Sequence, residues 1–425
     1  MQIVINNIIN KICSETKKTV KHGVIRVTTL TTGSEAWWQS KNGPEWERLK
    51  ENCRVTFWWR DPAGTQKTSS VKRVWLYVTG VTDHHQNARP QSLERIPDTD
   101  VWQWQGEFSP EWRGSYCFIP SENENDFADT VFEGELPDRM ALREGWRKLL
   151  PHAVSDPLNR QSWRGGRGHA VSALEMPDAP VQPGWDRPDT PYQQPVCIEW
   201  NSERLNNRRS VWIFTTGDDG PERPLAVLLD GQFWAESMPV WPALASLTTG
   251  RQLPSAVYVL IDAIDMEHRN RELPCNPDFW LAVQEELLPL VKHLTPFSDR
   301  ADRTVVAGQS FGGLSSLYAG LSWPRRFGCV LSQSGSYWWP HRGGQQEGCL
   351  IEQLRAGELT ASGLRIVLEA GRNEPLIFNA NQAIYAELHA QQQVTWRQVD
   401  GGHDALCWRG GLTQGLMTLW QPLIQ

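Results

Sequence analysis

A serine placed between two glycines is the first candidate for chemistry in this sequence. Gly308-Gln309-Ser310-Phe311-Gly312 fits the pattern G-x-S-x-G, follows an apolar run and precedes a stretch with helical spacing. At such a strand-to-helix turn, the glycines let the backbone bend sharply and hold the serine side chain out at the edge of a sheet. The pattern therefore predicts that Ser310 is a nucleophile, and a plain tight turn is the alternative.

A serine hydroxyl needs a base, and a histidine is the usual one. His403 lies in a loop just past the expected strand V-T-W-R-Q-V-D-G-G, whose two glycines precede it. Two other histidines compete for the role: His389 falls in a helical pattern, and His341 lies in a loop that could contact a substrate. The position of His403 just past a strand predicts that it is the base for Ser310.

The base in turn needs an orienting acid, which in this kind of fold comes between serine and histidine in the chain. Glu374 lies in the loop after the apolar run L-R-I-V-L-E-A-G and satisfies that order. Glu369 within that run and Asp400 at the end of the next one are rivals, and a serine-histidine dyad without a strict acid also stays open. We expect Glu374 to be the acid.

Attack on an acyl carbon creates an oxyanion, which fixed N–H donors must stabilise. The residue after the nucleophile, Phe311, supplies one backbone N–H. The second donor is expected from the loop after an earlier strand, where L-A-V-L-L-D-G-Q-F-W places Gly231 and Gln232. A simple Asp-Gly turn is the alternative for this loop.

The elements that must position these residues alternate between strand and helix after Val196. Near-continuous apolar strands separated by helices indicate a parallel sheet that is covered on both faces. The expected strands are S-V-W-I-F-T, P-L-A-V-L-L-D-G, A-V-Y-V-L-I-D-A, T-V-V-A-G-Q-S, F-G-C-V-L-S-Q-S-G, L-R-I-V-L-E-A-G and V-T-W-R-Q-V-D-G-G, with a helix over F-W-L-A-V-Q-E-E-L-L-P-L-V. The fold class predicted for this half is α/β, of the α/β-hydrolase type.

The preceding part of the chain has a different pattern. R-V-T-F-W-W-R, V-K-R-V-W-L-Y-V, V-W-Q-W-Q-G-E-F and W-R-G-S-Y-C-F-I-P read as short strands, which predicts an all-β, immunoglobulin-like sandwich. A Pro/Gly-rich stretch then marks a boundary. The predicted organisation is a poorly ordered extension (1–32), an N-terminal β-sandwich (33–150), a connector (151–195) and a catalytic α/β-hydrolase domain (196–425).

Composition excludes several classes of protein. The 425 residues carry a net charge of −7, which argues against a nucleic-acid binder, and no apolar run is long enough to predict a membrane span. Eight scattered cysteines without a C-x-x-C pair favour a reducing compartment, and no metal-ligand spacing is present. The first residues lack the features of a secretory signal. We therefore expect a cytoplasmic location and no metal site.

Longer stretches are specific enough to indicate a family. They are S-E-A-W-W-Q-S, V-T-F-W-W-R-D-P, V-T-G-V-T-D-H-H-Q-N, W-R-G-S-Y-C-F-I-P, G-G-R-G-H-A-V-S-A-L-E-M-P, A-G-Q-S-F-G-G-L, S-Q-S-G-S-Y-W-W-P-H-R-G-G-Q-Q-E-G and V-D-G-G-H-D-A-L-C-W-R-G-G. From about Gly33 to its end, the chain resembles the enterochelin (enterobactin) esterase family. The resemblance implies a cytoplasmic serine esterase acting on ferric enterobactin, a cyclic trilactone of dihydroxybenzoyl-serine, and on related catecholate siderophores. It implies no cofactor, since iron arrives with the substrate.

A trianionic substrate with catecholate rings calls for cations and flat aromatic side chains. The loops expected at the catalytic edge supply Arg342, Arg372, Arg409, Trp338, Trp339 and Trp408, and the connector adds Arg164, Arg167 and His169. We predict that these residues bind the substrate. The alternative for any one of them is a solvated arginine, a packed tryptophan or, for the connector, a flexible tether.

Two other functions remain open from the sequence. A carbohydrate-acyl or feruloyl-type esterase also joins a β-sandwich to a hydrolase domain, but such enzymes are typically secreted. A non-catalytic siderophore-binding protein would use the same pocket, and the intact order of Ser310, Glu374 and His403 argues against it.

Overall fold

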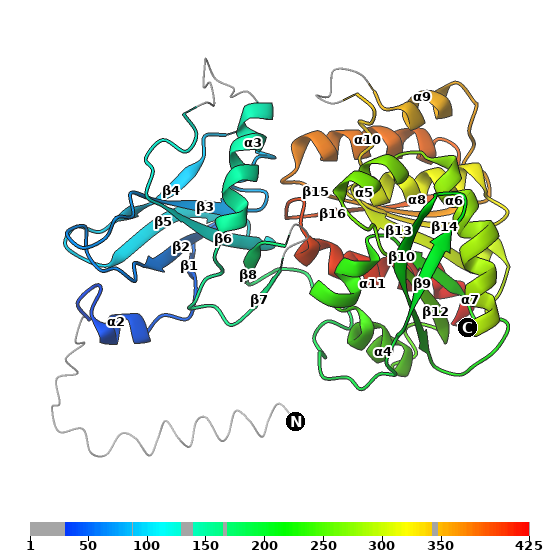
Figure 1. The fold of residues 1–425 in the computed structure, drawn as a ribbon, viewed down its shortest axis with the longest axis horizontal. Coiled ribbons are helices and arrows are strands. Elements are labelled where there is room, and N and C mark those ends of the chain that lie inside the picture. The colour runs from blue at the N-terminus through cyan, green and yellow to red at the C-terminus, as the bar shows by residue number, and fades with distance from the viewer. Residues whose placement is uncertain (1–29, 87, 129–138, 165–167, 342–346, 425) are drawn as a thin grey trace. The chain divides into compact units, whose positions relative to one another are not determined.

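The fold is given by a computed structural model that describes residues 30–86, 88–128, 139–164, 168–341 and 347–424 (Figure 1). The chain divides into two compact units, Met1–Lys41 and Asn42–Gln425. In the first unit the short helix α2 (Glu35–Gln39) is capped by Ser34, whose Oγ accepts a hydrogen bond from the N–H of Trp37. The extension predicted over residues 1–32 lies outside the described residues except for its last three, and it stays a prediction.

The first part of the second unit is an antiparallel sheet of eight strands in the order β1-β2-β5-β4-β3-β6-β8-β7. All four strands expected from the sequence are present in it. The bounds are β1 (Glu45–Arg48), β2 (Cys53–Arg60), β3 (Arg73–Val78), β4 (Gln91–Arg95), β5 (Val101–Phe108), β6 (Arg113–Ser121), β7 (Ser162–Arg164) and β8 (Ala170–Glu175). Strands β7 and β8 come from the segment predicted as a connector, and β8 pairs with β6.

Strand β3 explains how this sheet is buried on both of its faces. Its alternate residues Val74, Leu76 and Val78 belong to one core cluster, together with residues of β2, β5 and β6. The intervening Trp75 and Tyr77 belong to a second cluster, which helix α3 (Arg139–Leu149) helps to form. Because successive side chains of a strand point to opposite faces, β3 supports both layers. The N-terminal part is thus an all-β domain with an added helix.

The second sheet has eight strands in the order β16-β15-β14-β13-β11-β12-β10-β9. Strands β11 to β16 are parallel, as predicted, but β9 pairs with β10 and β10 with β12 in antiparallel fashion. Only a short turn joins β9 to β10, and it is too short for a crossover to a parallel neighbour. The bounds are β9 (Val196–Ser202), β10 (Asn207–Thr216), β11 (Leu225–Leu228), β12 (Ala256–Ile261), β13 (Thr304–Gln309), β14 (Cys329–Gln333), β15 (Arg365–Gly371) and β16 (Val394–Val399).

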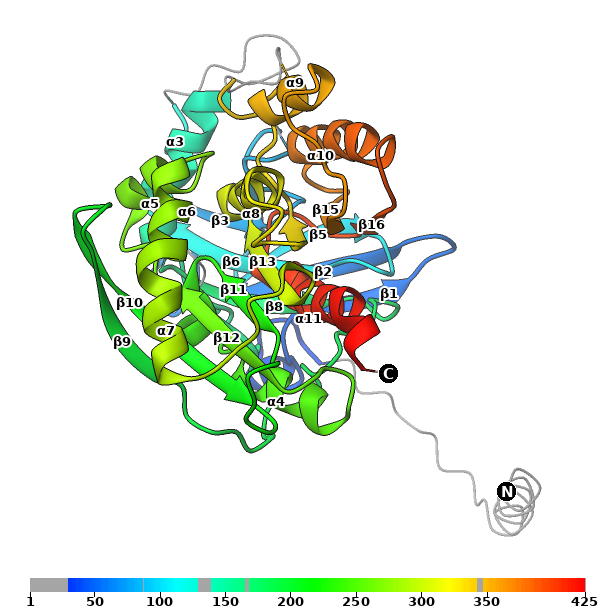
Figure 2. The same cartoon turned by 90° about the vertical axis from the view of Figure 1, so that its right-hand side faces the viewer.

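Helices cover both faces of this sheet (Figure 2). Residues of α6, α7, α8, α9 and α10 share one core cluster, whereas residues of α4 and α11 share the other. The bounds are α4 (Trp241–Thr249), α5 (Met266–Glu272), α6 (Pro277–Ala282), α7 (Leu288–Leu294), α8 (Phe311–Ser322), α9 (Cys349–Arg355), α10 (Pro375–His389) and α11 (Ala405–Trp420). The sequence predicts one helix over residues 279–291, but a π-helical turn, Val283–Leu287, separates α6 from α7. The α/β-hydrolase class predicted for this half is confirmed.

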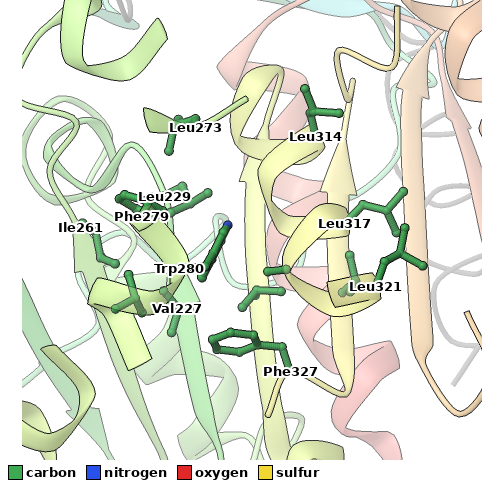
Figure 3. Packing of buried hydrophobic residues seen from close by; sticks show 14 of the residues in the cluster. Val227, Leu229, Ile261, Leu273, Phe279, Trp280, Leu314, Leu317, Leu321 and Phe327 are labelled. Carbon is green, nitrogen blue, oxygen red and sulfur yellow. The ribbon is translucent and has the colours of Figure 1, made fainter. Parts of the chain in front are cut away.

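In the first of these clusters, helix α8 packs together with β13, the strand that precedes it (Figure 3). Leu314 and Leu317 of α8 are buried in it, and Trp280 of α6 lies in the same cluster with its side chain fully enclosed. The indole N–H of Trp280 donates to Ser315 Oγ of α8 at 3.0 Å, so its one polar atom is satisfied. This packing holds the start of α8 in a defined position.

None of the helices in the described part of the chain has the length and apolar content that a membrane span requires.

Candidate active site

Ser310 occupies the turn between β13 and α8, at the carboxyl end of a central strand. Its φ of 59° and ψ of −119° lie outside the regions that L-residues normally adopt, and such strain costs about 1–3 kcal/mol. Gly308 makes the turn possible, because a Cβ there would lie 2.5 Å from the backbone carbon of Gly312. The backbone is thus held in the sharp bend that the sequence predicts.

The side chains of Glu374 and His403 are hydrogen-bonded to each other, with 2.6 Å between Oε2 and Nδ1. They come from the loops after β15 and β16, two parallel strands of the sheet that also contains β13. The side chain of Glu374 is fully buried and also accepts hydrogen bonds from Ser334 Oγ (2.5 Å) and the N–H of Gly371 (2.8 Å). A carboxylate fixed in this way orients the ring and leaves Nε2 to exchange a proton.

The rival acids have other partners. Glu369 accepts a hydrogen bond from Gln333 and pairs with Arg397, and burial raises its pKa. Asp400 pairs with Arg372 at 2.8 Å and accepts a hydrogen bond from Ser109. Of the three acids considered from the sequence, Glu374 is the one that contacts His403.

The rival histidines lie apart from this pair. His389 is at the end of α10, where its ring stacks on Tyr385 with centroids 5.1 Å apart. His341 lies in the loop that leads to the undescribed residues 342–346, and it does not line the cavity around Ser310. The geometry therefore groups His403 with Glu374 and leaves the other two histidines elsewhere.

The hydroxyl of Ser310 lies 3.3 Å from that of Ser336. Among the described residues, no hydrogen bond joins it to His403. Contacts between a nucleophile and its base often tighten only when a substrate binds. The ring of His403 is held by two neighbours, Trp408 at 4.7 Å in an edge-on contact and His85 at 5.0 Å between ring centroids.

The loop expected to complete the oxyanion site follows β11. Asp230 has a φ of 53°, and Gly231 follows it so close to β12 that a Cβ would lie 2.5 Å from the backbone nitrogen of Ile261. The side chain of Gln232 accepts a hydrogen bond from the N–H of Ala263 at 3.1 Å. Phe311 is the first residue of α8, and the first N–H groups of a helix have no partner within it.

Arg269 braces this loop from helix α5. Its guanidinium donates two hydrogen bonds to the carboxylate of Asp230, at 2.6 and 2.8 Å, and a longer one of 3.3 Å to the carbonyl of Gln309. Burial alone would lower the pKa of Arg269, but the charge of Asp230 and its hydrogen bonds to the guanidinium together raise this pKa. A single cation therefore links the Asp-Gly loop to the residue before Ser310.

Ser310 and His403 open into a cavity of about 550 Å³. Its lining combines both parts of the second unit: the hydrolase half provides Gln232, Phe233, Arg269, Ser310, His403 and Trp408, and the all-β domain provides Tyr77, His84, His85, Ser115, Trp163 and His169. Ligand pockets commonly form where domains meet. Most of these side chains are rings, so the cavity suits a flat aromatic ligand.

The structure places the predicted substrate residues in several environments. Trp408 and His169 line the cavity. Arg372 pairs with Asp400, and Arg409 pairs with Glu175 at 2.9 Å and donates to Gln182; neither lines the cavity. Trp338 and Trp339 pack against the core beside α8, where Trp338 lies 5.8 Å from the ring of Phe311. Arg167, Arg342 and the side chain of Arg164 lie outside the described residues.

Sequence reasoning missed several residues at this site. Ser334 accepts a hydrogen bond from the indole of Trp408 and donates to Glu374, and its φ of 48° follows a strand end. Arg269 lies on a helix with no recognisable motif. His85 belongs to the quoted stretch V-T-G-V-T-D-H-H-Q-N, to which no role was given. The two adjacent histidines in that stretch were the available signal.

Comparisons with known proteins agree with this geometry. The chain matches the family model "Enterochelin esterase, N-terminal" over residues 54–185 and the model "Putative esterase" over residues 202–419. It is 70% identical over 400 residues to the iron(III) enterobactin esterase of Escherichia coli (strain K12), covering 93% of this chain and 99% of that protein.

Two solved structures extend the similarity to the fold. The ferric enterobactin esterase from Salmonella typhimurium is 70% identical, with a TM-score of 0.89 over 92% of this chain and 100% of that one. The enterobactin esterase from Shigella flexneri, crystallised in the presence of enterobactin, is 69% identical, with a TM-score of 0.85 over 93% of this chain and 100% of that one. This chain belongs to the enterochelin esterase family.

Proposed function

We propose that this chain is a serine esterase that hydrolyses the three lactone bonds of ferric enterobactin to 2,3-dihydroxybenzoyl-serine units. Family membership at 70% identity supports the substrate, since the relative bears the name iron(III) enterobactin esterase. The observation that carries the chemistry is the 2.6 Å contact between Glu374 and His403, since His403 lines the same cavity as the strained Ser310.

The reaction proceeds in two halves. His403 takes the proton of Ser310 as Oγ attacks a lactone carbonyl, and Glu374 stabilises the resulting imidazolium. The N–H groups of Phe311, Gly231 and Gln232 bind the oxyanion. His403 then gives its proton to the leaving oxygen of the substrate's serine unit, which departs as a hydroxyl group. Water then attacks the acyl-enzyme by the same route. This hydrolysis needs no cofactor, because iron enters as part of the substrate.

The cavity supports a large aromatic substrate. Tyr77 and Trp163 of the all-β domain line it, as does Trp408 of the hydrolase half, which lies beside His403. Catecholate rings stack on such side chains, while the scissile ester reaches Ser310. Cleavage of the lactone ring weakens the iron cage, so that iron can be reduced and released. We place this step in the cytoplasm, in keeping with the thiol pattern of the sequence.

Product chromatography on three substrates in parallel tests this function. We expect the purified protein to convert ferric enterobactin and iron-free enterobactin to linear products and monomer, and to leave a feruloyl ester almost untouched. Faster cleavage of the feruloyl ester would indicate an acyl-sugar esterase instead. Binding of ferric enterobactin without any product would indicate a siderophore carrier.

A further inference from the structure

The loop after β3 contains a carboxylate with no part in the ester-cleaving machinery. Asp83 is completely buried, and no described side chain or backbone group gives either of its oxygens a hydrogen bond of ordinary geometry. A buried acid in this state is costly unless a cation or a proton compensates it.

Two imidazoles lie beside this carboxylate. Asp83, His84 and His85 each offer one ligand atom, and these atoms all lie within 4.8 Å of one another. Nδ1 of His84 lies 3.1 Å from the hydroxyl of Tyr77, a contact of the kind that fixes the ring of a metal-binding histidine. The rings of His84 and His85 have centroids 4.2 Å apart. The consecutive positions of these residues do not match the spacing of known metal motifs, which is why the sequence predicts no metal site.

The cluster is held against the catalytic loops. A Cβ on Gly80 would lie 2.8 Å from the Cα of Gly402, the residue before His403. The side chain of Gln86 donates to the carbonyl of Asn373, the residue before Glu374. Both histidines line the cavity that contains Ser310, and the ring of His85 lies 5.0 Å from that of His403.

We propose that Asp83, His84 and His85 form a binding site for a divalent first-row transition-metal ion at the edge of the catalytic cavity. Two imidazoles and one carboxylate suit iron(II), cobalt(II), nickel(II) or zinc(II) rather than calcium or magnesium. Ligand atoms around such an ion are about 3.3 Å apart, so the two half-buried imidazoles need only small rotations to converge. Ester cleavage does not require this ion.

The metal ion would lie at the cavity, next to a siderophore bound there. A divalent cation at this position would offset part of the negative charge of a catecholate siderophore and so strengthen its binding. That consequence rests on the proposed function, whereas metal binding itself does not.

Cobalt(II) alone, added to the chelator-treated full-length protein without siderophore, tests the proposal. We expect one cobalt ion per chain in equilibrium dialysis, d–d absorption bands in the visible spectrum, and a rise in Tm as cobalt is added. Asp83→Asn should weaken the binding about tenfold or more. It should not lower the Tm of the metal-free protein, because it removes a buried charge that has no partner.

Three further variants make the result specific. His85→Gln removes a second ligand and decides by the same criterion if Asp83→Asn fails to fold. His389→Gln removes an imidazole from α10, far from the cluster in sequence, and should bind cobalt like the wild type. Ser310→Ala should also bind cobalt normally, which separates this site from the esterase assignment. Failure of the wild type to bind cobalt, or unchanged binding by Asp83→Asn, would overturn the proposal.

Discussion

The carboxylate of Asp404 accepts two hydrogen bonds from Ser115, one from its backbone N–H at 2.5 Å and one from its hydroxyl at 2.8 Å. Asp404 directly follows His403 and also caps helix α11, since it accepts from the N–H of Leu406. Ser115 belongs to β6 of the all-β domain. One buried acid therefore ties that domain to the residue next to the candidate base.

Ser115→Ala tests the hydrogen bond between the Ser115 hydroxyl and Asp404, and it changes the volume of the side chain only slightly. The substitution removes a hydroxyl bonded to a buried carboxylate, which typically lowers the free energy of unfolding by about 1.5–3 kcal/mol. Because the lost bond lies beside His403, kcat for ferric enterobactin should fall with it. Ser70→Ala is the control, because the hydroxyl of Ser70 bonds to exposed Glu122 instead. Equal kinetics for the two variants would show that the tie does not position His403.

Gly80→Ala should disturb the contact between the all-β domain and the loop that carries His403. Gly80 has a φ of 78°, and the added methyl would collide with the backbone of Gly402. Gly357→Ala is a matched control, because Gly357 has a φ of 71° but open space around its Cα. Both variants carry similar backbone strain, so a larger loss of Tm and of kcat in Gly80→Ala measures the contact alone. Similar losses in both would contradict a role for it.

Glu374→Gln should lower kcat by about 10²–10⁴-fold while KM changes little, because the amide cannot stabilise the imidazolium of His403. Steady-state kinetics of Asp400→Asn provide the comparison, since Asp400 pairs with Arg372 and Ser109 and does not contact His403. A larger effect from Asp400→Asn than from Glu374→Gln would show that the wrong acid has been assigned.

Arg269→Lys keeps the charge but loses the two-pronged contact with Asp230. The loop with Gly231 and Gln232 should then be less firmly held, so we expect kcat to fall about tenfold or more, since the loss of even one oxyanion donor costs about 10²–10³ in kcat. Arg271→Lys, on the exposed side of the same helix, is the control. Unchanged kcat in Arg269→Lys would exclude a positioning role for this arginine.

Much of the fold was predictable because strong local patterns coincide with buried surfaces. Strands such as β13 and β15 have apolar centres and are almost wholly buried, since both faces of the parallel sheet are covered by helices. The exception is the antiparallel pair β9 and β10. Apolar content alone does not report strand direction, and only the short turn between the two strands carries that information.

The candidate site was predictable where the chain order and strand ends determine it. Ser310, Glu374 and His403 each follow a parallel strand, so their loops meet at one edge of the sheet. Arg372 directly follows β15 and Arg409 lies in α11, and both pair with acids that are distant in sequence, Asp400 and Glu175. The pairing of Arg372 with Asp400 depends on how the loops after β15 and β16 meet. The pairing of Arg409 with Glu175 and the approach of His85 to His403 depend on how the two domains pack. None of these contacts leaves a periodic signal in the sequence.

The rate of product formation by Ser310→Ala on ferric enterobactin tests the central claim most directly. Release of 2,3-dihydroxybenzoyl-serine is followed by chromatography, and substrate binding by quenching of tryptophan fluorescence. We predict that wild-type protein forms the monomer, that Ser310→Ala is slower by at least about 10⁴-fold, and that its affinity for the substrate stays within about threefold. Product formation by Ser310→Ala within about tenfold of the wild-type rate would contradict the account.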